Sequence, residues 1–139
     1  MKKIIALYRR ANTGKTNTLN HLIGLLDKTQ EVYGDDLAKD RRVSIPYGNK
    51  EIAVTTWGDN GNELNENIKF FEEGNCDILV TATRTWGETT KILNDYASKN
   101  GIKIVWIEKN TSIILKDLIN QTQAKDIQAV IDSLIDNDH

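Results

Sequence analysis

The chain has 139 residues, and its 39% of hydrophobic and 27% of charged residues are typical of a globular protein rather than a disordered one. Its 18 basic and 20 acidic residues nearly cancel, which excludes a generally basic protein that binds nucleic acid non-specifically. The single cysteine, Cys76, excludes an internal disulfide and a multi-cysteine metal site, and the two histidines, His21 and His139, leave little for a histidine-based one.

The start of the chain predicts no targeting segment. The apolar run after Lys3 is short and ends at Arg9-Arg10, whereas a signal peptide needs a longer apolar core and a small-residue cleavage site. No stretch approaches the ~20 apolar residues of a membrane span. Because Cys76 is unpaired, we expect a cytoplasmic protein without membrane association.

Hydrophobic periodicity and turn residues predict strands that alternate with helices, and the length favours one domain over residues 1–139. The expected elements, in chain order, are strand Lys3–Tyr8, helix Lys15–Asp27, loop 28–41, strands Val43–Tyr47 and Glu51–Trp57, helix Glu63–Glu73, strand Asp77–Thr83, helix Glu88–Asn100, strand Ile102–Ile107, and helices Ile113–Gln121 and Ala124–Ile135.

These elements predict an α/β fold. Gly48-Asn49-Lys50 predicts a hairpin turn, and Pro46, which has no amide hydrogen to donate, places the first hairpin strand at the sheet edge. The alternation elsewhere predicts a mostly parallel sheet with helices on both faces, which is a three-layer αβα sandwich. We expect residues 111–139 to supply covering helices.

The segment between the first strand and the first helix reads Arg9-Arg-Ala-Asn-Thr-Gly-Lys-Thr16. Amides at a helix N-terminus converge on one point and the helix dipole adds positive potential there, so this position suits a phosphate group. Gly14 would let the backbone approach a phosphate oxygen closely. The segment resembles the Walker A pattern GxxxxGK[ST] of the P-loop NTPase superfamily.

The resemblance implies a site for a nucleoside triphosphate and Mg²⁺. Lys15 would bridge the β- and γ-phosphates, and the Thr16 hydroxyl would ligate the metal. The chain departs from the pattern at Arg9, which stands in place of glycine and either turns outward or occupies the phosphate space. The residues implied to hold the phosphates are Asn12, Thr13, Gly14, Lys15, Thr16 and Asn17.

A P-loop site also needs an acid at the end of a neighbouring strand to hold Mg²⁺. Asp59 and Glu108 each follow an expected strand. We favour Asp59, because a hairpin followed by such a turn resembles the layout of small GTPases, although aspartate is also common in tight turns. The stretch Glu108–Ser112 lacks the NKxD-type motif that reads guanine, so ATP is favoured over GTP.

A second segment of interest, Thr81–Glu88, ends a strand where open α/β sheets bind ligands. Arg84 would stabilise charge on a transferred γ-phosphate or bind a substrate anion, with a surface ion pair as the alternative. Thr85 and Glu88 predict a capping box at the start of the next helix.

Aromatic and basic residues near these segments have simpler interpretations. We expect Trp57 and Trp86 to pack on the rim of the core more readily than to stack on a base. Arg41 and Arg42 are interpreted as solvated charges.

Three functions are compatible with the sequence. The favoured one is a small P-loop protein that binds a nucleotide with Mg²⁺ and hydrolyses it or transfers its γ-phosphoryl group, with Lys15 and Arg84 as catalytic residues and Thr16 and Asp59 at the metal. The alternative is a non-catalytic, nucleotide-sensing or protein-interaction module with an unidentified protein partner. A flavodoxin-like fold is the least favoured, because no GxGxxG is present.

Overall fold

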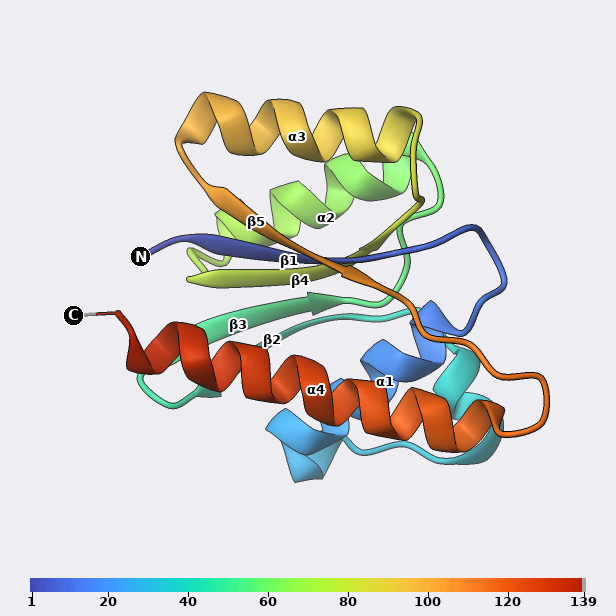
Figure 1. Cartoon of the computed structure of the whole chain (residues 1–139). Helices are drawn as coiled ribbons and strands as arrows, with labels where there is room; N and C mark the ends of the chain where they lie inside the picture. Colours follow the sequence, from blue (N-terminus) through green and yellow to red (C-terminus); the bar gives the residue numbers. More distant parts are fainter. Residues whose placement is uncertain (139) are drawn as a thin grey trace.

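The computed structural model describes residues 1–138, so His139 lies outside the described residues (Figure 1). The elements, in chain order, are β1 (Lys3–Tyr8), α1 (Lys15–Leu26), the 3₁₀ turns η1 (Lys28–Gln30) and η2 (Gly34–Ala38), β2 (Arg42–Tyr47), β3 (Lys50–Thr55), α2 (Gly61–Glu73), β4 (Ile78–Thr83), α3 (Glu88–Asn100), β5 (Lys103–Glu108) and α4 (Lys116–Asp136). The expected strand Lys3–Tyr8 and helix Glu88–Asn100 are reproduced to the residue.

The five strands form one sheet in the order β2-β3-β4-β1-β5. Strand β1 runs parallel to both β4 and β5, β3 runs parallel to β4, and only the β2–β3 hairpin is antiparallel. The hairpin turns at Gly48, whose φ of 62° suits a glycine. Pro46 therefore lies on an edge strand, as expected from its missing amide hydrogen.

Helices cover both faces of the sheet, so the expected mostly parallel α/β architecture with an antiparallel edge is confirmed. Helices α1 and α4 lie on one face, and α2 and α3 lie on the other (Figure 1). On the first face Leu22 and Ile127 are fully buried, and on the second Leu64, Phe71 and Leu93 are buried. Burying these side chains drives the layers together.

The C-terminal segment differs from the expectation, because one continuous helix, α4, replaces the two expected helices. The polar residues Thr122 and Gln123 separate the two expected helices in the sequence. In the structure Gln123 lies inside the continuous helix, where its side chain is buried and hydrogen-bonded. Its amide nitrogen donates to the carbonyl of Glu108 at 2.7 Å, and its amide oxygen accepts from the amide of Asn110 at 2.8 Å. These bonds hold α4 to the end of β5.

The helix α4 also begins later than expected. Ile113 and Ile114 lie in the connection before it and are 92% and 89% exposed. Among residues 1–138, no helix combines the length and the apolar character needed to cross a membrane.

Cys76, just before β4, is fully buried in the core on the α2 and α3 face. Its Sγ lies 3.5 Å from the hydroxyl of Ser44 on the edge strand. Burial raises the pKa of this thiol above its usual value. The side chain acts as a small apolar residue of the core, as its position in the sequence indicated.

Candidate functional site

The loop between β1 and α1 turns sharply at two residues. Asn12 and Gly14 have φ values of 61° and 89°, and Gly14 is the N-cap of α1. No side chain caps this helix, and its first turn contains no acidic residue. The first amides of α1 therefore have no internal acceptor, which leaves a positive helix end able to bind an anion.

A side chain at position 14 is excluded for two reasons. The positive φ of Gly14 strains any other residue, and a Cβ there would lie 2.9 Å from the amide oxygen of Asn120 on α4. The same oxygen accepts a hydrogen bond from the buried Thr18 hydroxyl at 3.2 Å. Helix α4 thus packs directly against the start of α1 and fixes the shape of the loop.

The side chain of Lys15 is the centre of the site. It is only 5% exposed, and its ammonium group donates to the carbonyls of Arg9 and Thr83 at 2.6 and 2.7 Å and to the Asp59 carboxylate at 3.2 Å. Burial lowers the pKa of Lys15, and the negative charge of Asp59 partly offsets this effect. A cation is therefore held inside the loop by acceptors from three separate segments.

Two acidic residues lie near the start of α1, Asp59 beside Lys15 and Asp40 beside Thr16. The Thr16 hydroxyl donates to the carbonyl of Thr56 at 3.0 Å and lies 3.4 Å from the carboxylate of Asp40. Loss of hydration raises the pKa of Asp40, and the charge of Asp59 raises it further. Asp40 was not predicted from the sequence, because nothing in a polar stretch between η2 and β2 signals its contact with Thr16.

These groups fit Mg²⁺. In the described part of the chain, no cluster of three or more acidic, histidine or cysteine side chains could hold a metal by itself. Mg²⁺, however, is usually held by one or two carboxylates together with substrate phosphates. The hydroxyl of Thr16 and the carboxylates of Asp40 and Asp59 provide such oxygen donors around one corner.

The structure separates the two acids considered for the metal. Glu108, at the end of β5, forms an ion pair with Arg9 at 3.3 Å, whereas Asp59 lies beside Lys15. Arg9 also donates to the carbonyl of Lys109 at 3.5 Å. Its side chain therefore turns toward β5 and leaves the interior of the loop to Lys15.

The expected capping box at α3 is wrong. The N-cap is Gly87, without a side-chain cap. Thr89 accepts from the backbone amide of Arg84 at 3.1 Å, and Thr90 donates to the Arg84 carbonyl at 3.0 Å. A helix start at a glycine with φ 98° leaves Thr85 too far back in the turn to cap it, and the two threonines inside the helix hold the loop instead.

The side chain of Arg84 reaches the backbone of Asp59. Its Nε donates to the backbone carbonyl of Asp59 at 3.1 Å, and residues 1–138 give it no ion pair. Arg84 and Lys15 thus bind the same residue. Close by, the hydroxyl of Thr83 is buried without a hydrogen-bond partner among the described residues, which is costly unless a water or ligand oxygen reaches it.

Arg41 and Arg42 are not the solvated charges that we expected. Arg41 donates to the side chain of Asn20 at 2.7 Å and to the carbonyl of Gln30 at 3.1 Å. Arg42 donates to Asn67 at 2.8 Å and lies 4.1 Å over the ring of Trp57. Both arginines tie the polar segment and the edge strand to neighbouring helices, which their adjacency in the sequence does not reveal.

The two tryptophans lie in different surroundings. Trp57 is half-buried beneath Arg42, which matches a residue at the rim of the core, whereas Trp86 is 80% exposed, which does not. The remaining predicted phosphate residues are close to the loop. The Thr13 hydroxyl donates to the Arg10 carbonyl at 2.9 Å, and Asn17 lies half-buried in the first turn of α1.

A cavity of about 280 Å³ opens beside the loop, between the first turns of α4 and the connection after β5. Asn12, Gly14, Asn120 and Lys109 are among its lining residues. Lys109 is 1% exposed, and burial lowers its pKa to about 8, with the charge of Arg9 adding to the effect. The loop between β1 and α1 forms one wall of this cavity.

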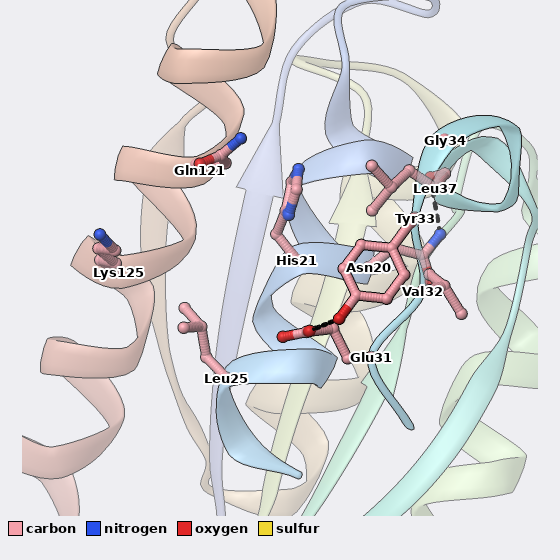
Figure 2. Close-up of a pocket in the computed structure, with 10 residues that line it drawn as sticks. All are labelled: Asn20, His21, Leu25, Glu31, Val32, Tyr33, Gly34, Leu37, Gln121 and Lys125. Atoms are coloured by element: carbon pink, nitrogen blue, oxygen red, sulfur yellow. Dashed lines mark hydrogen bonds between the residues drawn. The ribbon is translucent and has the colours of Figure 1, made fainter. Parts of the chain in front are cut away.

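A separate cavity of about 320 Å³ lies on the flank of α1, between α4 and the η2 segment (Figure 2). His21 and Lys125 line it from the two helices, and Tyr33 and Glu31 lie opposite. Asn20 donates from its wall to the carbonyls at 37 and 39 at 2.8 and 2.7 Å. The cavity contains no residue of the loop, but Asn20 fixes the segment that presents Asp40 to Thr16.

Comparison of the chain with protein-family models, with curated proteins and with solved structures finds no significant match.

Proposed function

We propose that this protein binds a nucleoside triphosphate with Mg²⁺ and cleaves the bond to its γ-phosphoryl group. The observation that carries this proposal is the buried Lys15, held by three oxygen acceptors inside a loop that opens an uncapped helix. The ammonium group adds a full positive charge to a helix end whose first amides already attract anions, which supports a phosphate group as the ligand of this loop.

Each group around the loop has a task in this proposal. The amides at the start of α1 and the Lys15 ammonium would bind the phosphates, and Thr16, Asp40 and Asp59 would hold Mg²⁺, which neutralises charge on the phosphates. Arg84, anchored through its Nε to Asp59, has terminal nitrogens that would stabilise charge developing on the transferred group.

The adjoining cavity of about 280 Å³ suits the nucleoside. It offers the polar side chains of Asn12, Thr111 and Ser112 and an apolar edge at Ile113. Within the described part of the chain, no aspartate or glutamate lines this cavity to pair with a guanine edge, so we favour ATP.

A calorimetric titration tests the proposal. Non-hydrolysable ATP and GTP analogues are titrated with and without Mg²⁺ into the wild type, Lys15→Met and the control Lys99→Met, an exposed lysine at the far end of α3. We expect Mg²⁺-dependent binding, stronger for ATP and weakened about 10- to 100-fold by Lys15→Met alone, since a hydrogen bond to a charged group contributes about 1.5–3 kcal/mol. Absence of binding by a folded wild type would refute the proposal.

One observation favours a protein-interaction module as the second candidate. The exposed apolar side chains before and at the start of α4 lie beside the loop: Ile113, Ile114, Leu115 and Leu118. Exposed apolar groups of this kind often mark a partner surface. This candidate predicts nucleotide binding without turnover, so measuring released phosphate under saturating ATP separates the two.

A further inference from the structure

A group of basic and aromatic side chains lies next to the proposed phosphate-binding loop. Arg10, Arg84 and the exposed Trp86 line a cavity of about 250 Å³ together with Thr85. Thr85 also lines a neighbouring cavity of about 400 Å³, whose wall includes Tyr8 and Trp106. The two cavities adjoin at Thr85. The one lined by Arg10, Arg84 and Trp86 is called the groove, and the rings of Tyr8 and Trp106 lie in the neighbouring cavity.

The basic end of the groove is prepared for an anion. The backbone of Arg84 is held on both sides by Thr89 and Thr90, and its Nε is bound to the Asp59 carbonyl. Within residues 1–138 its terminal nitrogens have no hydrogen-bond partner, and the side chain of Arg10 is exposed. A planar fork fixed at its base and free at its tip matches phosphate or carboxylate oxygens.

The aromatic side chains in and beside the groove point to a planar ligand. Trp86 is 80% exposed in the turn between β4 and α3, and Trp106 is 37% exposed and packs edge-on against Tyr8 with ring centroids 6.1 Å apart. Exposed indole rings beside arginine are the usual surface on which nucleobases stack. A core role does not explain Trp86, because most of its ring contacts solvent.

We propose that this groove is a second ligand site, beside the proposed phosphate-binding loop and sharing Arg10 with it, for a small planar anion of the nucleoside monophosphate class. The phosphate is bound by Arg84 and Arg10, and the base stacks on Trp86. A general nucleic-acid surface is disfavoured, because the net charge of the chain is −2 and only two basic residues, Arg10 and Arg84, line the groove.

The groove also suggests what the ligand does, and this step rests on the proposed function. Arg84 and Lys15 bind the same residue, Asp59, so the two anion sites are neighbours. A phosphate oxygen of the monophosphate attacks the γ-phosphorus, and the bond from that phosphorus to the bridging oxygen breaks. The electron pair leaves on the nucleoside diphosphate, so two diphosphates form and no redox partner is needed.

Binding is tested by calorimetry with the four common nucleoside 5′-monophosphates. Adenosine, which lacks the anion, and ribose 5-phosphate, which lacks the ring, serve as comparators. We expect the monophosphate to bind the wild type and Lys15→Met equally and to bind Arg84→Gln and Trp86→Leu about ten-fold more weakly, because stacking one base contributes about 1–3 kcal/mol. The controls Lys99→Gln and Tyr33→Leu, which remove an exposed charge and an exposed aromatic ring elsewhere, should bind as the wild type does.

Several results would overturn the site. These are ribose 5-phosphate binding as tightly as the monophosphate, loss of monophosphate binding in Lys15→Met, an oligonucleotide binding more tightly than the mononucleotide, or no monophosphate binding at all. Transfer is followed by the products of ATP turnover. Diphosphate formed from both nucleotides supports the acceptor role, and release of inorganic phosphate alone overturns it. If ATP itself fails to bind, the proposed function fails, while monophosphate binding to the groove still decides the site.

Discussion

The loop after β1 and the loop after β4 lie side by side at one edge of the sheet, because the two strands pair in parallel from Lys3 with Ile78 to Tyr8 with Thr83. Each leads into a helix whose N-cap is a glycine at positive φ, 89° at Gly14 and 98° at Gly87, without a side-chain cap.

The two helices differ in the residue that comes directly after the glycine. Helix α1 has no acid in its first turn and begins with the inward-pointing Lys15, whereas α3 carries Glu88 in its first turn. The acid supplies α3 with the negative charge that its positive end attracts, and α1 is left to attract a charge from outside. The two glycines share a positive φ but differ in ψ, which is 15° at Gly14 and −148° at Gly87. The side chain that follows each glycine leaves one helix end neutralised and the other available.

The largest expected effect distinguishes Asp59, the acid beside Lys15, from Glu108 as the ligand of the proposed metal. Asp59→Asn should lower Mg²⁺-dependent ATP turnover at least about 100-fold, which corresponds to about 2.7 kcal/mol of transition-state free energy, since it removes a charge from the metal corner. Glu108→Gln, which removes the Arg9 partner at the end of β5, should leave turnover nearly unchanged. If steady-state assays gave the larger loss for Glu108→Gln, the metal ligand would be Glu108 at the end of β5 and not Asp59.

A second buried lysine, Lys109, shows how the pKa of a buried ammonium group responds when the described part of the chain gives it few hydrogen-bond acceptors and no acidic partner, in contrast to Lys15. Within residues 1–138 the Lys109 ammonium donates only to the carbonyl of Asn110, and its pKa falls to about 8 from an ordinary value of 10.5. Between these pH values the unfolded chain binds the proton more readily than the native one, so the wild type gains stability as pH rises. Lys109→Met should therefore be more stable than the wild type at pH 7, by up to about 3 kcal/mol.

Urea denaturation at pH 7 and at about pH 10 measures this difference. The advantage of Lys109→Met should shrink toward zero at the higher pH, where the native lysine is already neutral. An advantage that stays constant with pH would mean that packing, not charge, explains it.

The paired substitutions Gly14→Ala and Gly87→Ala test the comparison directly. Both force alanine into a positive φ, which costs about 1–3 kcal/mol. Only Gly14→Ala also places a Cβ 2.9 Å from Asn120, whereas a Cβ at Gly87 meets nothing within 4 Å. Titration should show weaker ATP binding, by about ten-fold, for Gly14→Ala alone. Equal losses in both variants would contradict a phosphate site confined to α1.

The smallest effect concerns the threonines that hold the loop after β4. Thr89→Val should destabilise the protein by about 1–2 kcal/mol, because the part-buried Arg84 amide loses its acceptor. Thr90→Val, which removes a more exposed bond to the Arg84 carbonyl, should cost less. Denaturation curves rank the two, and ATP binding at α1 should be the same in both variants.

Most of the fold was predictable from the sequence, because the residues that each helix or strand buries are apolar and regularly spaced. The alternating elements from Lys3 to Glu108, the edge position of Pro46 and the glycine at the hairpin turn all follow from local patterns. Helix α4 was predicted as two helices because Gln123 looks like a polar break in the local pattern. Its hydrogen bond to the end of β5, which holds it in the buried face of one helix, depends on a distant segment.

The site was predictable only where its geometry is local. Gly14, Lys15 and Thr16 are consecutive, so their shared role could be inferred from one segment. Asp40 reaches Thr16 across a polar stretch that has no periodicity, and Arg41 finds Asn20 in the same way. Such contacts are set by tertiary packing, so no spacing in the sequence records them.

The single, buried Cys76 makes opening of the core measurable by thiol labelling. Only an exposed thiolate reacts with a thiol reagent, so the labelling rate of this single cysteine counts how often the core on the α2 and α3 face opens. Cys76 precedes β4, at the opposite end of the sheet from the loop between β1 and α1. A ligand of that loop that slows the labelling therefore stabilises the core at the far end of the sheet as well, and the chain reports this without an engineered probe.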